Sequence, residues 1–191
     1  MNNPILFVNA CVREASRTRR LAGRLLDRLS GPFDEVRLNK IAFPVVNEDY
    51  LNLRDRLIRE GDFGSPMFDL ARQFAEAETI VIAAPYWDLS FPAVLKQYIE
   101  LINVVGISFK YTEAGVPVGL CRAKRLYYVT TAGGCYVPEA FGFGYIKDLA
   151  QSFYGIQDIR LVQAVGLDID GADVEALLRA AEASLADIAP D

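Results

Sequence analysis

The sequence contains no histidine among its 191 residues, and this absence excludes several kinds of catalytic site. A Ser-His-Asp or Cys-His arrangement needs an imidazole as its base, so neither can be present. Zinc sites with histidine ligands and proton relays through histidine are excluded for the same reason. We therefore assign no side chain to catalysis from the sequence.

Cysteine is scarce, because the chain holds only Cys11, Cys121 and Cys135 and no C-x-x-C pair. Three scattered thiols cannot form a four-cysteine zinc or iron–sulfur site, so we predict no metal site. Unpaired cysteines are typical of a reducing compartment. The longest uncharged apolar run, residues 79–87, is far shorter than the ~20 residues of a membrane-spanning helix. We expect a cytoplasmic protein that does not bind membranes.

Positive charge is also in deficit, because 20 Lys and Arg residues face 25 Asp and Glu residues, for a net charge of −5. Non-specific nucleic-acid binding needs a positive excess, so we expect no nucleic-acid partner. The apolar fraction of 52% and the charged fraction of 24% are typical of a globular protein. The length favours a single domain over residues 1–191.

Short apolar runs alternate along the chain with segments of helical periodicity. The runs that indicate strands are residues 5–8, 36–38, 79–84, 126–131 and 159–165. Helical patterns follow each of them, and Gly31-Pro32 is expected to end the first helix. This alternation predicts an α/β fold with a doubly wound, five-stranded parallel sheet. The half-exposed second strand favours the strand order 2-1-3-4-5, in which ligands bind at the carboxyl ends of strands 1, 3 and 4.

The loop after the first strand places hydroxyl groups at the start of a helix. It lacks both G-x-G-x-x-G and G-x-x-x-x-G-K-[ST], so it is neither a dinucleotide fingerprint nor a P-loop. Ser16 and Thr18 lie where free backbone N–H groups and the helix dipole attract anions. This pattern suits a terminal phosphate, although Ser16 would also serve as an ordinary helix N-cap.

The loops after the third and fourth strands carry aromatic residues and glycines. Tyr86, Trp87 and Phe91 lie in a loop bounded by prolines, where they would either stack on a flat ring or pack against the helix cap. Gly133-Gly134 would let backbone N–H groups approach a planar ligand. Three compatible loops at one sheet edge predict a ligand-binding cleft.

At these residues the chain resembles the FMN-dependent NAD(P)H:quinone oxidoreductases and azoreductases of the flavodoxin-like fold. The A-P-Y-W-D-L of residues 84–89 is similar to the family's A-P-M-Y-N-F loop. The G-I-S-F-K-Y-T-E-A-G of residues 106–115 resembles its G-V-T-F-R-Y-T-E-N-G segment. The T-A-G-G of residues 131–134 is similar to its S-R-G-G loop. The matching segments follow one another in the family's order over nearly the whole chain.

The resemblance implies a homodimer with FMN in each subunit and NADH or NADPH as electron donor. It implies a ping-pong reaction that reduces quinones, azo compounds or similar small-molecule acceptors. By position, the phosphate would be held by Ser16, Arg17 and Thr18; the isoalloxazine by Pro85, Tyr86, Trp87, Asp88 and Leu89; and its pyrimidine side by Thr131, Ala132, Gly133 and Gly134.

Two residues depart from the family pattern. Ala10 stands where the family often has a serine, and Asp88 stands where it has an asparagine. A carboxylate facing the flavin would make it harder to reduce, whereas a carboxylate pointing to solvent would not. These departures leave open an interaction module of this fold that has lost FMN. A flavodoxin-like electron carrier is a further alternative, although flavodoxins tend to be shorter and more acidic than this chain.

Overall fold

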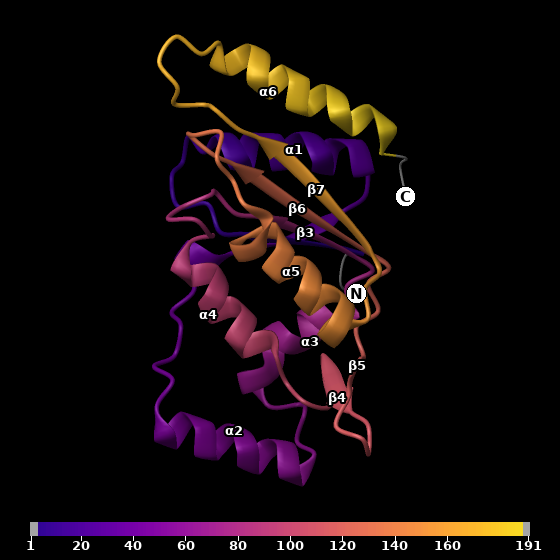
Figure 1. Cartoon of the computed structure of the whole chain (residues 1–191). Coiled ribbons are helices and arrows are strands. Elements are labelled where there is room, and N and C mark those ends of the chain that lie inside the picture. The colour runs from indigo at the N-terminus through magenta and orange to yellow at the C-terminus, as the bar shows by residue number, and fades with distance from the viewer. Residues whose placement is uncertain (1–3, 189–191) are drawn as a thin grey trace.

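A computed structural model describes residues 4–188, so the first three and last three residues of the expected domain lie outside the described residues. The fold is built on a five-stranded parallel sheet with the order β2-β1-β3-β6-β7. The strands are β1 (Ile5–Asn9), β2 (Phe33–Arg37), β3 (Thr79–Ala83), β6 (Arg125–Thr131) and β7 (Asp158–Ala164). Numbered along this sheet, the order is 2-1-3-4-5, which confirms the predicted flavodoxin-like architecture (Figure 1).

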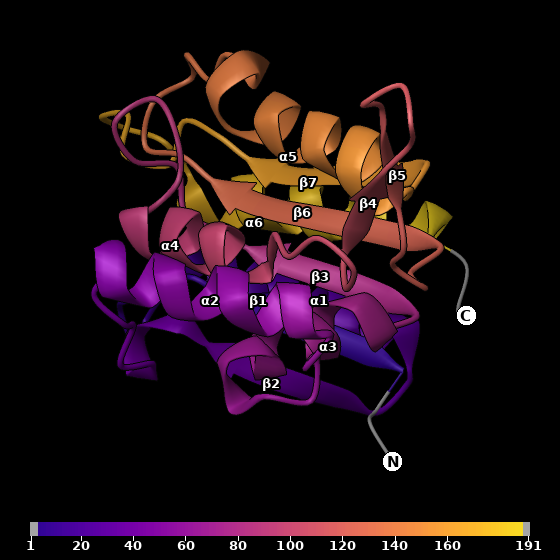
Figure 2. The ribbon, with the colours of Figure 1, turned by 90° about the horizontal axis from the view of Figure 1, so that it is seen from below.

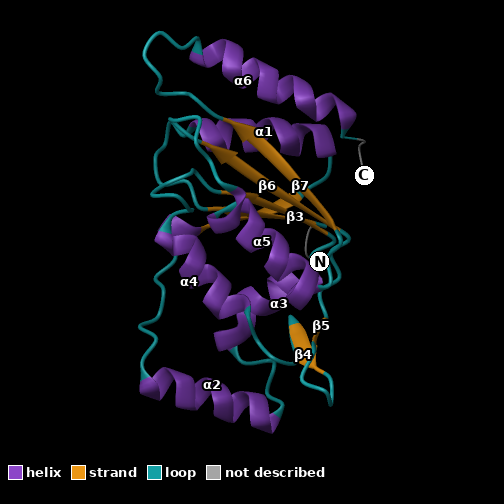
Figure 3. Ribbon diagram, in the orientation of Figure 1, coloured by secondary structure: helices purple, strands orange, loops and turns teal. Residues whose placement is uncertain are grey.

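Helices cover both faces of the sheet (Figures 1 and 3). The α-helices are α1 (Arg17–Leu29), α2 (Glu48–Glu60), α3 (Asp69–Glu76), α4 (Ala93–Ile102), α5 (Phe143–Leu149) and α6 (Val174–Ala183). A π-helical turn, Ala150–Tyr154, extends α5, and single 3-10 turns lie at Leu38–Lys40, Pro66–Phe68, Glu139–Phe141 and Ser184–Asp187. Helices α1 and α6 lie on one face, while α3, α4 and α5 lie on the other.

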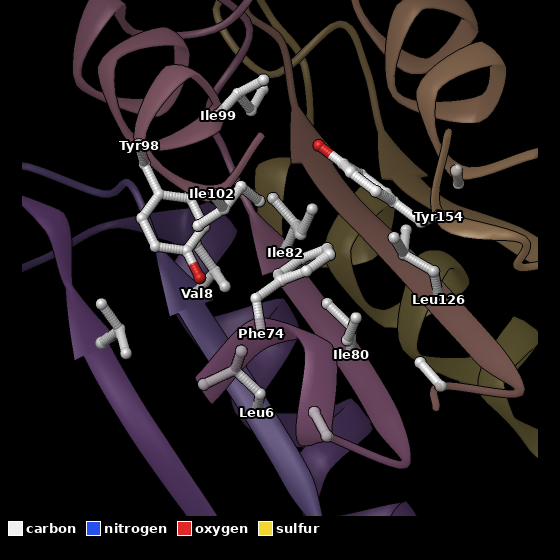
Figure 4. Close-up of a cluster of buried hydrophobic side chains, with 14 of the residues drawn as sticks. Leu6, Val8, Phe74, Ile80, Ile82, Tyr98, Ile99, Ile102, Leu126 and Tyr154 are labelled. Atoms are coloured by element: carbon white, nitrogen blue, oxygen red, sulfur yellow. The ribbon is translucent and has the colours of Figure 1, made fainter. Parts of the chain in front are cut away.

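The alternation of side chains along the buried strands produces two hydrophobic cores. In β1, Ile5 and Phe7 point towards α1 and α6, whereas Leu6 and Val8 point towards α3 and α4. Figure 4 shows the second core, where Phe74 lies among the strand side chains and the helix residues. Because both faces are covered, the open edge at the carboxyl ends of the strands is left for a ligand.

Two elements lie outside this layered body. Helix α2 is farthest from the sheet in Figure 1, and in the view from below it passes in front of the sheet (Figure 2). None of its thirteen residues, all within the described part of the chain, is buried. A hairpin of β4 (Phe109–Tyr111) and β5 (Pro117–Gly119) overlaps the 106–115 segment, whose residues form the first strand and the turn. Over residues 4–188, no helix combines the length and the apolar character needed to cross a membrane.

Two boundaries differ from the sequence expectation. The first helix ends at Leu29, and Ser30, not Gly31, takes the left-handed conformation, with φ of 58°. Its hydroxyl donates to the Asp27 carbonyl oxygen at 3.1 Å, which helps a non-glycine residue occupy this cap. The second strand ends at Arg37, because buried Leu38 already begins a 3-10 turn.

Candidate functional site

The three predicted loops meet in one open cleft of about 310 Å³ at the carboxyl edge of the sheet. Its lining comes from four segments: Val12, Arg13, Ala15, Ser16, Arg17 and Thr18; Pro85, Tyr86 and Trp87; Thr131, Ala132 and Gly133; and Leu167 and Asp168. Nine of the twelve predicted site residues are therefore brought together. Asp88, Leu89 and Gly134 lie outside the lining.

One end of the cleft is formed by the start of α1. Ser16 is the N-cap residue, and its Oγ accepts a hydrogen bond from the Arg19 N–H at 3.2 Å. The first backbone N–H groups of a helix have no acceptor within the helix, so those of Arg17 and Thr18 are available to a ligand. The helix dipole adds partial positive charge at this end. Ser16 thus acts as the helix N-cap and also lines the cleft.

A buried hydrogen bond ties the first loop to the third. The Thr18 and Thr131 hydroxyl oxygens are 2.7 Å apart, and Thr18 is only 1% exposed. The Tyr86 N–H donates to the Thr131 carbonyl oxygen at 3.0 Å and so attaches the second loop as well. These contacts fix the three loops relative to one another, with the Thr18 hydroxyl already engaged by Thr131.

The second loop supplies a wall of rings. Pro85, Tyr86 and Trp87 line the cleft, and Trp87 remains 41% exposed. The Tyr86 hydroxyl is buried, and the residue also borders a small cavity lined by Tyr128 and Thr130. Burial raises the pKa of Tyr86 above its ordinary value. Tyr86 therefore lines the cleft with atoms other than its hydroxyl oxygen.

A tight turn carries Asp88 and Leu89 away from the cleft. Trp87 and Ser90 exchange backbone hydrogen bonds of 2.9 and 2.8 Å. Asp88 and Leu89 have φ values of +50° and +67°, the pattern of a type I′ turn. The Ser90 hydroxyl donates to the Phe141 carbonyl oxygen at 2.5 Å and anchors the turn. Asp88 is exposed at its tip, as in the solvent-facing alternative.

The third loop continues the pairing of β6 with β7 beyond the strands. The Leu167 N–H donates to the Ala132 carbonyl at 3.1 Å, and the Asp168 N–H donates to the Gly133 carbonyl at 3.0 Å. The Gly134 carbonyl oxygen accepts a hydrogen bond from the Gly166 N–H, and Gly134 lies outside the cleft lining. This pairing brings Leu167 and Asp168 into the lining. The signal that points to them is their position directly after the fifth strand, which ends at the same edge.

Arg17 crosses from α1 to this segment. Its Nη1 donates to the Leu167 carbonyl at 3.2 Å and to Asp168 Oδ1 at 2.7 Å. Both charged side chains are substantially exposed, at 43% and 69%. Ala10, by contrast, is fully buried and offers no side-chain donor to the cleft.

Comparison with known proteins identifies the family of the chain. The model of the flavodoxin-like fold family matches residues 3–188. An FMN-dependent NADH:quinone oxidoreductase of Clostridium beijerinckii is 35% identical over 94% of each chain. FMN-dependent NADH:quinone oxidoreductase 2 of Clostridium acetobutylicum is 39% identical over 92% of each chain.

Solved structures agree with the fold. An azoreductase of Bacillus anthracis superposes with a TM-score of 0.82 at 27% identity, covering 95% of this chain and 96% of that one. A second Bacillus anthracis structure, an FMN-dependent NADH-azoreductase in complex with FMN, has a TM-score of 0.78 at 22% identity, and the match covers 99% of this chain and 100% of that chain. The match therefore extends over the whole layered body and not over the sheet alone.

Proposed function

The chain belongs to the flavodoxin-like family of FMN-dependent NADH:quinone oxidoreductases, and we propose that it binds FMN in the cleft and reduces quinones or azo compounds. The observation that carries this proposal is the meeting of nine predicted residues in one cleft that has a hydroxyl-rich end and a ring-lined wall. The full-length similarity to named oxidoreductases supports an electron-transfer role for that cleft.

The phosphate of FMN fits the end formed by α1. The first turn reads Arg-Thr-Arg-Arg, so the free N–H groups there are accompanied by positive and not negative side chains. Ser16 and Arg17 add a hydroxyl group and a guanidinium group at the same end. A terminal phosphate is therefore met by the helix dipole, by backbone donors and by a cation.

The isoalloxazine fits the remainder of the cleft. Pro85 and Trp87 offer flat surfaces on which an aromatic ring can pack. In the neighbouring loop, Ala132 and Gly133 are small enough for the backbone to approach a planar ligand. The donors and surfaces present match the two chemically different parts of FMN.

The chemistry supplied by bound FMN is hydride transfer from NADH or NADPH, followed in a ping-pong sequence by electron transfer to the acceptor. The chain's own residues bind and orient the cofactor. The Thr18–Thr131 hydrogen bond and the Tyr86–Thr131 backbone contact hold the loops in register for this purpose. Trp87 is partly exposed beside the cleft. The flavin ring packed beside it would therefore remain accessible to the two substrates in turn.

The test is to add FMN to the apoprotein and to measure NADH and NADPH oxidation with a benzoquinone and with an azo dye. The proposal predicts a yellow protein whose pyridine-nucleotide oxidation requires both FMN and an acceptor. A yellow protein that reduces neither acceptor would instead be a flavodoxin-like electron carrier. A protein that stays colourless would be an interaction module of the same fold.

The homodimer and the cytoplasmic location expected from the sequence belong to the same proposal. Several large apolar side chains are exposed in the segments that follow β3 and β6, among them Leu89 at 47%, Tyr136 at 77% and Phe141 at 57%. Helix α2, which buries none of its described residues within the subunit, is a further surface for a second copy. The apolar face of α4, which includes Leu95, is buried inside the subunit, so this face is not available to a second copy.

A further inference from the structure

The structure holds Arg17 in place from a segment that the sequence did not predict as part of the site. Both hydrogen bonds described for its side chain use one nitrogen, Nη1, which donates to the Leu167 carbonyl and to Asp168 Oδ1. A guanidinium group has five N–H donors, so three remain on Nη2 and Nε. Within residues 4–188 these three donors make no hydrogen bond, and they belong to a side chain that lines the cleft.

Gly133 provides the space in which the carboxylate lies. A Cβ atom at this position would come within 2.3 Å of Asp168 Oδ2, so any larger residue would push the carboxylate aside. The Asp168 N–H is fixed as well, because it donates to the Gly133 carbonyl at 3.0 Å. Asp168 is thus placed by the Gly133 carbonyl in the loop after β6 and by the absence of a side chain at residue 133.

We propose that Asp168 is a positioning residue that holds the Arg17 guanidinium at the phosphate end of the cleft, and this inference rests on the proposed function. Asp168 opposes and assists phosphate binding in different ways. Its oxygen keeps Arg17 over the start of α1, whereas its negative charge repels a phosphate in the same cleft. An asparagine keeps an acceptor oxygen and removes the charge, while an alanine removes both.

The experiment measures the affinity of the apoprotein for FMN and for riboflavin, which lacks the phosphate. Wild type, Asp168→Asn and Asp168→Ala are titrated, each alone and combined with Arg17→Met. The Asn variant should bind FMN at least as tightly as wild type, because the acceptor is kept and the repulsion is gone. The Ala variant should bind FMN roughly threefold or more weakly than the Asn variant, a modest factor because the pair is exposed.

The difference between Asn and Ala should disappear in the Arg17→Met background and should be absent with riboflavin. Equal FMN affinities for the Asn and Ala variants with Arg17 intact would overturn the positioning role. A difference that persists with riboflavin would also overturn it, because the effect would then be a general change in the cleft. Failure of wild type to bind either flavin would instead contradict the proposed function.

Discussion

Ser16 shows how one side chain can serve the fold and the proposed site together. Its hydroxyl oxygen accepts the Arg19 N–H and so begins α1, and the same residue lines the cleft. Aspartate is also a good N-cap residue, so replacing Ser16 by Asp keeps the cap while adding negative charge where the phosphate would lie. Binding and stability can therefore be separated at this position.

We predict that Ser16→Asp weakens FMN binding at least tenfold, which corresponds to about 1.4 kcal/mol, without lowering the melting temperature. The cause is repulsion between the new carboxylate and the phosphate. Ser65→Asp is the matched control, because Ser65 also accepts a backbone hydrogen bond at the start of a helical turn but lies outside the cleft. FMN titrations of both variants make the comparison. Equal affinities would remove Ser16 from the phosphate site.

Asp88 illustrates a residue whose influence depends on where its side chain points. A carboxylate roughly 6 Å from a reduced, anionic flavin would lower the midpoint potential by an amount on the order of 60 mV. The structure instead places Asp88 at the exposed tip of a turn, outside the cleft lining, where solvent and salt screen its charge.

We therefore predict that Asp88→Asn shifts the FMN midpoint potential by less than about 10 mV, a small part of the unscreened effect. Stability should be unchanged or slightly raised, because asparagine tolerates the left-handed backbone conformation at φ of +50°. Potentiometric titration of both proteins at one pH and one salt concentration is the measurement. A rise of tens of millivolts in the variant would show that the carboxylate faces the flavin.

At the scale of elements, an ion-pair cluster joins the amino ends of β6 and β7. Asp158 lies directly opposite Arg125 in the strand register and accepts its Nε–H at 2.6 Å. Arg160 Nε donates to the other carboxylate oxygen at 2.9 Å. The hydrogen bonds from Arg160, and then from Arg125, lower the pKa of Asp158 below its ordinary value.

Because the folded pKa is lowered, the ionised Asp158 stabilises the fold above its ordinary pKa near 4, and this contribution is lost as the pH falls through the folded value. Asp158→Asn should thus reduce the unfolding free energy at pH 7, by less than about 1 kcal/mol since the carboxylate is 37% exposed. The gap between the two proteins should close on acidification towards pH about 3. Urea unfolding of both proteins at several pH values measures this difference in unfolding free energy. A difference that does not change with pH would contradict the ion-pair account.

The regular elements were predictable because their signals are local. The continuously apolar runs at residues 5–8 and 79–84 could only be strands buried on both faces. Asn47 caps α2 and Gly61 ends it in the left-handed conformation, so this helix follows ordinary start and stop rules. The end of α1 was misplaced because Ser30 takes the left-handed conformation that usually favours glycine, and its hydroxyl donates to backbone carbonyls of the last helical turn.

The contacts that complete the site were not predictable, because they join residues far apart in the chain. The Thr18–Thr131 and Arg17–Asp168 hydrogen bonds depend on the sheet order and on loop conformation. The turn at Asp88 is also hidden in the sequence, since leucine at residue 89 rarely takes a positive φ. Local patterns thus identified which loops form the cleft, but not which residues of each loop face it.

At the scale of the whole molecule, we predict that the protein is a dimer in solution. The physical reason is the exposed apolar surface in the segments after β3 and β6 and on α2, where Leu51 and Leu53 are 37% and 39% exposed. Light scattering at micromolar concentration should give twice the 21.2 kDa chain mass. Leu53→Glu would place charge on this surface and should weaken the dimer. Glu48→Gln on the same helix is the control and should leave the dimer mass unchanged. A monomeric mass for the wild-type protein would contradict the dimer.

The central claim is that the cleft at the carboxyl edge of the sheet binds FMN. Trp87 is the only tryptophan in the chain and lines this cleft, so its fluorescence reports on the site from a single source. Titration of the apoprotein with FMN should quench this emission and saturate at one FMN per chain, because a flavin packed on the ring accepts its excitation energy. Emission that stays unchanged after correction for FMN absorbance would contradict the account, because it would place FMN away from Trp87.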